Sequence, residues 1–259
     1  MEKYKKILIK IATKKKKLLL KIFEFEGMIS SKWVSAAHER LFWAEWCIPK
    51  TPEFFDHNLD LYYQWRKYKE PYWLERGIYG LQALKMFDEP VVLELGCGDG
   101  FNACNFYSTS AKSIVSCDFD KSAIKTAKKK NQAENVEFIL ADIRTKMPDI
   151  KECTNVVWDA SIEHFTESEI ENIMKQIKTR LQEKQGILSG HTIVEKADGK
   201  KSLYQHKYEF KNMADLKRFL TPYFKNVLVF ETIYKSRHNL YFYASDGDIP
   251  FSNQWKHKV

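Results

Sequence analysis

The chain has 259 residues, of which 44% are hydrophobic and 14% aromatic, a composition typical of a globular protein with a full core. No apolar run approaches the ~20 residues that a membrane-spanning helix requires. The five cysteines show no C-x-x-C spacing, which argues against a disulfide framework or a structural zinc site and favours a reducing, cytoplasmic location.

The formal net charge of +8 belongs almost entirely to the N-terminus. Residues 1–25 hold nine lysines and two glutamates, whereas the rest of the chain is nearly balanced. On a helical wheel the apolar residues of this segment share one side and most lysines the other, as in helices that lie on anionic membranes. The alternative is a solvated basic tail. We therefore expect a basic amphipathic arm over residues 1–25, and a body without the net basic charge that would attract nucleic acid, although a local basic patch is compatible with the sequence.

Residues 26–89 are rich in aromatic residues, and Pro49, Pro52 and Pro71 interrupt them. Their spacing favours short helices. We predict a helical cap over the mouth of a sheet, with most of the aromatic side chains in the core and a minority at a substrate pocket.

Strand and helix patterns alternate through residues 90–247, and residues 248–259 form a C-terminal tail. Strands are predicted at 91–95, 113–117, 136–140, 155–159, 187–194, 227–233 and 240–244, and helices at about 100–109, 121–131, 167–183 and 212–220. This alternation predicts a parallel sheet covered on both faces, with the last two strands as an antiparallel hairpin. Residues 166–169 read Thr-Glu-Ser-Glu, a capping box that begins the third helix.

The first predicted strand ends in the pattern Glu-x-Gly-x-Gly-x-Gly, formed by Glu94, Gly96, Gly98 and Gly100. A strand followed by a tight turn and a helix presses a nucleotide-like ligand against the end of a parallel sheet. Glycine allows positive φ and close approach of the ligand. The dinucleotide fingerprint would need a glycine where Phe101 stands, and no Lys-Ser/Thr pair follows as in a phosphate-binding loop.

This turn resembles motif I of the class I S-adenosylmethionine-dependent methyltransferases. The resemblance covers residues from about 60 to 250 and implies a doubly wound, mostly parallel seven-stranded sheet of Rossmann-like α/β class. It also implies S-adenosylmethionine as the cofactor, with an acidic residue after the second strand for the ribose hydroxyls. Asp118, followed by Phe119, meets this requirement; Asp120 is a weaker candidate, and a helix N-cap is the alternative role of Asp118. After the third strand, Asp142 is placed to accept from the adenine amino group and Ile143 to pack on the ring.

The fourth strand ends at Asp159 and leads into Glu163 and His164, a segment that in this superfamily passes beside the methyl donor and the acceptor. We expect His164 to be the proton acceptor, oriented by Glu163, with a purely structural capping role as the alternative. Arg76 suits the methionine carboxylate of the cofactor, unless it forms a surface ion pair with Glu75 or Asp88. Further candidates near the last strands are His191, His206, Tyr208, Arg237 and His238.

Some quinone-pathway methyltransferases bind a divalent ion beside a similar Glu-His pair, with a carboxylate three residues before the glutamate. Ala160 stands at that position, so we expect no metal. The favoured function is methyl transfer to a small-molecule or glycan-type acceptor, preferably to oxygen. The alternatives are an RNA or protein methyltransferase tethered by the lysine arm, a nicotinamide-dependent oxidoreductase, and a non-catalytic S-adenosylmethionine-binding protein.

Overall fold

The computed structural model describes residues 2–47, 65, 69–150, 152–183, 185–196, 198–199 and 201–252. Its body is built on one seven-stranded sheet of order β3-β2-β1-β4-β5-β7-β6. The strands are β1 (Val91–Leu95), β2 (Ser113–Asp118), β3 (Val136–Leu140), β4 (Asn155–Asp159), β5 (Ile187–Ile193), β6 (Asn226–Ile233) and β7 (His238–Ser245). The first five run parallel, and β7 is antiparallel to both β5 and β6. The doubly wound, mostly parallel sheet predicted from the sequence is confirmed.

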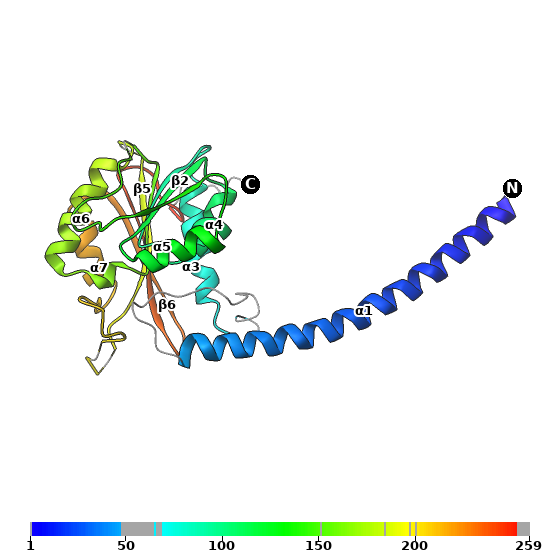
Figure 1. Ribbon diagram of the computed structural model, residues 1–259. Coiled ribbons are helices and arrows are strands. Elements are labelled where there is room, and N and C mark those ends of the chain that lie inside the picture. Colours follow the sequence, from blue (N-terminus) through cyan, green and yellow to red (C-terminus); the bar gives the residue numbers. More distant parts are fainter. Residues whose placement is uncertain are drawn as a thin grey trace.

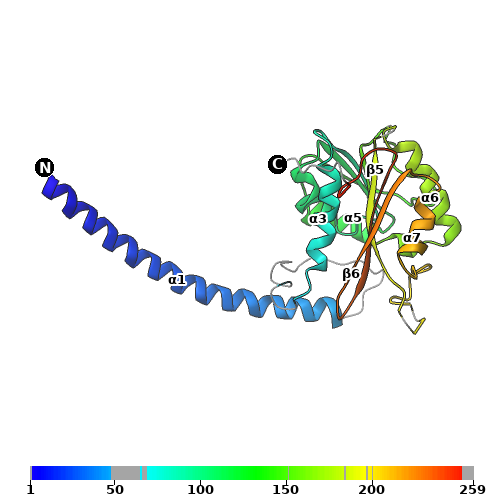
Figure 2. The same cartoon turned by 180° about the vertical axis from the view of Figure 1, so that it is seen from behind.

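Helices cover both faces of this sheet, as Figures 1 and 2 show from opposite sides. The helices of the body are α3 (Tyr72–Leu84), α4 (Phe101–Asn105), α5 (Lys121–Lys130), α6 (Glu167–Arg180) and α7 (Met213–Leu220), with 3-10 turns η1 (Tyr107–Thr109) and η2 (Ile162–His164). In Figure 1, α3, α4 and α5 lie on one side of the sheet and α6 and α7 on the other. Because both faces are covered, the central strands β1 and β4 are buried along almost their whole length rather than at alternate residues.

The ends of these helices follow local signals in the sequence. Thr166 caps α6: its hydroxyl accepts from the Glu169 backbone N–H at 3.3 Å, and the Glu169 carboxylate accepts from the Thr166 N–H at 2.8 Å. This confirms the predicted capping box. The helix predicted over residues 100–109 is divided into α4 and η1. Gly100 begins α4 in the left-handed conformation.

The N-terminal segment differs from its prediction. A single helix, α1 (Glu2–Cys47), runs through the boundary that we expected at residue 25, and it projects from the body in Figures 1 and 2. Trp33 lies on it with 72% of its surface exposed, so this aromatic residue is not in the core. No helix within the described ranges is both long and apolar enough to cross a membrane.

The predicted cap over residues 26–89 is represented in the body by α3. This helix contacts β4 and β5 and so covers a face of the sheet, with Trp73 and Leu84 buried. The parts of the predicted cap at 48–64 and 66–68 lie outside the described residues. In the predicted tail, Ile249 packs into a small core cluster with Ala83 and Tyr243, while residues 253–259 are again outside the described part.

Candidate active site

A cavity of about 780 Å³ opens at the carboxyl ends of the parallel strands. The strand order reverses between β1 and β4, and ligands of open α/β sheets bind at such a switch point. Residues that follow β1, β2, β3, β4 and β5 all line the cavity, together with the segment before α7 and the β6–β7 turn. Its volume lies within the range of about 300–1,000 Å³ that is usual for small-molecule sites.

The glycine turn forms one wall of this cavity. Gly96 and Gly98 line it with φ of 71° and 54°, in the left-handed region that glycine tolerates. A Cβ atom on Gly96 would lie 2.5 Å from the Ser161 hydroxyl. Gly100 also has a positive φ but is not among the lining residues; a Cβ there would lie 2.5 Å from the Phe138 ring. Gly100 therefore packs beside Phe138, and its predicted cofactor contact stays a prediction.

Asp118 ends β2 directly beside the turn. Its two carboxylate oxygens accept from the backbone N–H groups of Gly98 and Asp120, each at 2.9 Å. Each oxygen keeps a further lone pair, which can accept a hydroxyl from a ligand in the cavity. Burial raises the pKa of Asp118 although these hydrogen bonds favour its charged form. The capping role considered for Asp118 belongs to Asp120, whose carboxylate accepts from the Ser122 N–H at the start of α5.

Glu94 lies at the base of the cavity, 3% exposed, and accepts a hydrogen bond of 2.7 Å from the Ser116 hydroxyl. Burial, followed by the nearby carboxylates of Asp159 and Asp99, raises its pKa to about 8. Glu94 is therefore largely protonated at neutral pH, and it can donate a hydrogen bond as well as accept one.

Arg76, from α3, forms an ion pair with Asp159 at 2.6 Å, and both side chains are almost fully buried at the edge of the cavity. Asn102 donates to the same carboxylate oxygen at 3.2 Å. Burial lowers the pKa of Arg76, but Asp159 outweighs this effect and the pKa is raised. Neither of the surface ion pairs considered for Arg76 forms; Glu75 instead accepts from the Tyr241 hydroxyl.

The end of β3 and the residue after β2 supply the remaining predicted cofactor residues. Asp142 lines the cavity and pairs with Arg144 at 2.6 Å, and hydrogen bonds from Arg144 lower its pKa. Ile143 is 5% exposed, with its side chain partly in the core and partly at the cavity wall. Phe119, which follows Asp118, is 63% exposed and also lines the cavity. All three residues line the cavity, and the sequence predicts that they contact the adenosine of the cofactor.

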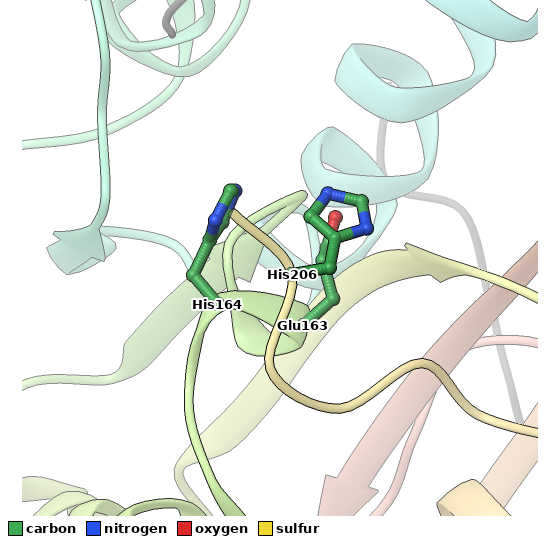
Figure 3. A group of neighbouring side chains, drawn as sticks. All are labelled: Glu163, His164 and His206. Carbon is green, nitrogen blue, oxygen red and sulfur yellow. The ribbon is translucent and has the colours of Figure 1, made fainter. Parts of the chain in front are cut away.

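Elsewhere on the cavity wall, Glu163 and His164 lie in η2 after β4, and His206 approaches them from the loop after β5 (Figure 3). The rings of His164 and His206 meet edge to face, with centroids 4.8 Å apart. Glu163 is 3% exposed and accepts from the Thr192 hydroxyl at 3.0 Å. One donor atom from each of Glu163, His164 and His206 lies within 4.8 Å of the other two, although the sequence considered His206 only singly.

The other candidates from the sequence divide into two groups. Arg237 and His238 line the cavity. His191 does not: it is buried in β5 beside Asn239 and the Asp159 carboxylate, and burial lowers its pKa well below the usual value. Tyr208 is also outside the lining and hydrogen-bonds to Asp215. A missed residue is Glu209, whose carboxylate pairs with the ring of His206; the His-x-x-Glu spacing is its only local signal.

Comparison with known proteins agrees with this geometry. Residues 92–184 match the family model described as "Methyltransferase domain". No curated protein matches the chain. Among solved structures, the DhpI complex with S-adenosylhomocysteine is 20% identical, with a TM-score of 0.54 over 68% of this chain and 87% of that one. A putative methyltransferase from Bacillus halodurans is 14% identical, with a TM-score of 0.54 over 66% and 99%.

A third similar structure is human N-acetylserotonin methyltransferase in complex with S-adenosylmethionine, 16% identical, with a TM-score of 0.53 over 73% of this chain and 57% of that one. At these identities the likeness shows the fold. The donors around the cavity fit the cofactor: a glycine turn without phosphate-binding residues, a carboxylate after β2 and a polar site after β3. With the methyltransferase-domain match over residues 92–184, these features identify a methyltransferase domain of the class I, S-adenosylmethionine-dependent type in this part of the chain, with S-adenosylmethionine as the cofactor.

Proposed function

We propose that the protein methylates an oxygen of a small-molecule or glycan-type acceptor. The observation that carries this proposal is the group Glu163, His164 and His206 on the cavity wall. When bound, S-adenosylmethionine supplies a methyl group whose carbon–sulfur bond breaks as an acceptor oxygen attacks the carbon. An imidazole at this place is suited to take the hydroxyl proton, and His164 is the residue we assign to it, with Glu163 orienting the acceptor.

On the cofactor side we assign the ribose hydroxyls to Asp118, the adenine amino group to Asp142, and ring packing to Ile143 and Phe119. The paired arrangement of Arg76 and Asp159 supports a joint role at the amino-acid end of the cofactor, since a cation and a carboxylate suit a carboxylate and an ammonium respectively. We assign Glu94, which also lines the cavity, to the same end of the cofactor.

The walls of the acceptor half favour a small, acidic acceptor. Arg237 is half-buried, lies 5.0 Å from the centroid of the Tyr72 ring, and donates through Nε to Asn239. Within the described ranges no carboxylate is paired with this guanidinium, so an acidic group on the acceptor would supply the missing charge. The near-neutral body and the enclosed volume give less support to an RNA or protein acceptor.

The test is a methyl-transfer assay on a panel of phenols, sugars, sugar acids, RNA and protein, with release of S-adenosylhomocysteine as the readout. We expect turnover with small hydroxyl acceptors, and His164→Gln should lower kcat by about 100-fold or more while cofactor binding persists. Glu137→Gln, at an exposed position on β3 outside the cavity lining, is the control. Methylation of RNA or protein alone would contradict the proposal, and cofactor binding without turnover would favour a non-catalytic protein.

We further propose that α1 binds the anionic inner surface of a membrane, with the catalytic body in the cytoplasm. Its exposed apolar residues include Leu18, Phe23, Phe25 and Trp33, and its first half carries the lysine excess. A long helix with both features suits an interfacial position. Co-sedimentation should show binding to phosphatidylglycerol vesicles but not to phosphatidylcholine vesicles, and deletion of residues 1–25 should abolish it. Salt-dependent binding to RNA with no vesicle binding would instead support the nucleic-acid tether.

A further inference from the structure

We infer that Glu163, His164 and His206 form a binding site for a divalent transition-metal ion. One donor atom of each lies within 4.8 Å of the other two, and the side chains converge from η2 and from the loop after β5 (Figure 3). Glu163 and His206 are only 3% and 2% exposed. Two buried side chains that can ligate a metal thus meet a third one at a single place on the cavity wall.

His206 is oriented for such a role by a second carboxylate. Its Nδ1 pairs with the Glu209 carboxylate, which also accepts from the Ser202 backbone N–H at 2.6 Å. We assign the ring proton of His206 to Nδ1, where the carboxylate can accept it, and this assignment puts the lone pair of the neutral imidazole on Nε2. Metal-binding histidines typically donate their other ring N–H to a carboxylate in this way, which fixes the tautomer and raises ligand basicity.

Glu163 is held by a comparable set of contacts. The Thr192 hydroxyl donates to Oε2, which leaves Oε1 to bind an ion. The backbone carbonyl of Glu163 accepts from the N–H groups of Lys207 and Tyr208 at 2.8 and 3.1 Å. These two bonds tie the loop that carries His206 to η2, so the ligands come from two segments fastened together. The prediction of no metal considered only the residue three before Glu163; the fold supplies His206 instead.

Two imidazoles and one carboxylate favour Zn²⁺, Mn²⁺, Fe²⁺ or Co²⁺ over Ca²⁺ and Mg²⁺, which prefer oxygen ligands. Metal–ligand bonds of about 2.0–2.2 Å separate ligands by about 3–4 Å, so the donors must close by about 1 Å. All three residues line the cavity, so further ligand positions are accessible from it. A bound acceptor oxygen there would be polarised by the ion. This last role rests on the proposed function, and in it His164 is a ligand rather than the proton acceptor.

The test is a titration of the chelator-stripped, full-length protein with Co²⁺, followed by its visible absorption and by competition with Zn²⁺. We expect saturation at one ion per chain. Glu163→Gln and His206→Gln should weaken binding by roughly 100-fold or more, and Glu209→Gln, which only removes the orienting carboxylate, by about 10–100-fold. His238→Gln is the control, because this histidine pairs with Glu231 outside the cluster. Unchanged titration with S-adenosylhomocysteine shows that each variant is folded.

Absence of saturable Co²⁺ binding, or equal Co²⁺ affinity in wild type and His206→Gln, would overturn the metal site. The binding assay needs no acceptor, so its outcome is independent of whether the proposed methylation is correct. Once an acceptor is known, loss of turnover on chelation and its recovery with Zn²⁺ or Mn²⁺ would support the role at the acceptor oxygen. Full turnover after chelation would overturn that role and return His164 to the position of proton acceptor.

Discussion

The raised pKa of Glu94 predicts a dependence of stability on pH that the substitution Glu94→Gln removes. The pKa is about 8 in the folded chain, against 4.5 for an ordinary glutamate. Between these values the folded chain holds a proton on Glu94 that the unfolded chain has lost, so the free energy of unfolding falls as the pH rises. The difference of about 3.5 between the two pKa values, at about 1.4 kcal/mol per unit, corresponds to about 5 kcal/mol.

The assay is urea-induced unfolding of wild type and Glu94→Gln over a series from about pH 5 to about pH 9. Glutamine keeps an acceptor for the Ser116 hydroxyl but does not ionise. The stability of wild type relative to the variant should therefore fall by up to about 1.4 kcal/mol per pH unit and level off above pH 8. Glu137→Gln, at an exposed position on β3, controls for the loss of one carboxylate. A constant difference across the series would refute the reasoning.

Three other substitutions test separate contacts. Arg76→Met leaves Asp159 buried without its partner and should lower the free energy of unfolding in urea by about 3–5 kcal/mol. The double variant with Asp159→Asn should recover much of this loss, and full additivity of the two substitutions would contradict the pairing. Gly96→Ala combines a positive φ with a clash against Ser161, so titration calorimetry should show a large loss of cofactor affinity. Wild-type affinity in this variant would contradict the role of the glycine turn in cofactor binding. Thr166→Ala removes a helix cap and should lower stability by about 1 kcal/mol; no change would mean the cap is dispensable.

The sheet and the cofactor side of the site were predictable because their signals are local. β1 ends at Leu95 directly before Gly96, β2 ends in Asp118 itself, and β3 ends two residues before Asp142. Parallel strands bring these carboxyl ends to one edge of the sheet. The hydrogen bond from the Gly98 N–H to Asp118 is the direct consequence of pairing β1 with β2. Local pattern and topology agree at this edge, so the sequence alone could predict which residues lie there, while their roles toward the cofactor stay predictions.

The remaining features depend on contacts between distant segments, which a single sequence does not show. Arg76 and Asp159 are 83 residues apart, and His206 reaches Glu163 only because the loop after β5 is fastened to η2. The predicted boundary of the arm differs from the structure for another reason. Its boundary at residue 25 was a change in charge and not a helix stop signal, and Gly27 alone does not end α1.

The most direct test of the central claim, that the carboxyl ends of β1 and β2 hold S-adenosylmethionine, is titration calorimetry of Asp118→Ala with S-adenosylhomocysteine. Two charge-assisted hydrogen bonds to ribose hydroxyls are at stake, so affinity should fall by roughly 10–100-fold relative to wild type. Asp215→Asn, whose carboxylate pairs with Arg218 outside the cavity lining, should bind as wild type does. Equal affinity of wild type and Asp118→Ala, or no binding by wild type, would contradict the account.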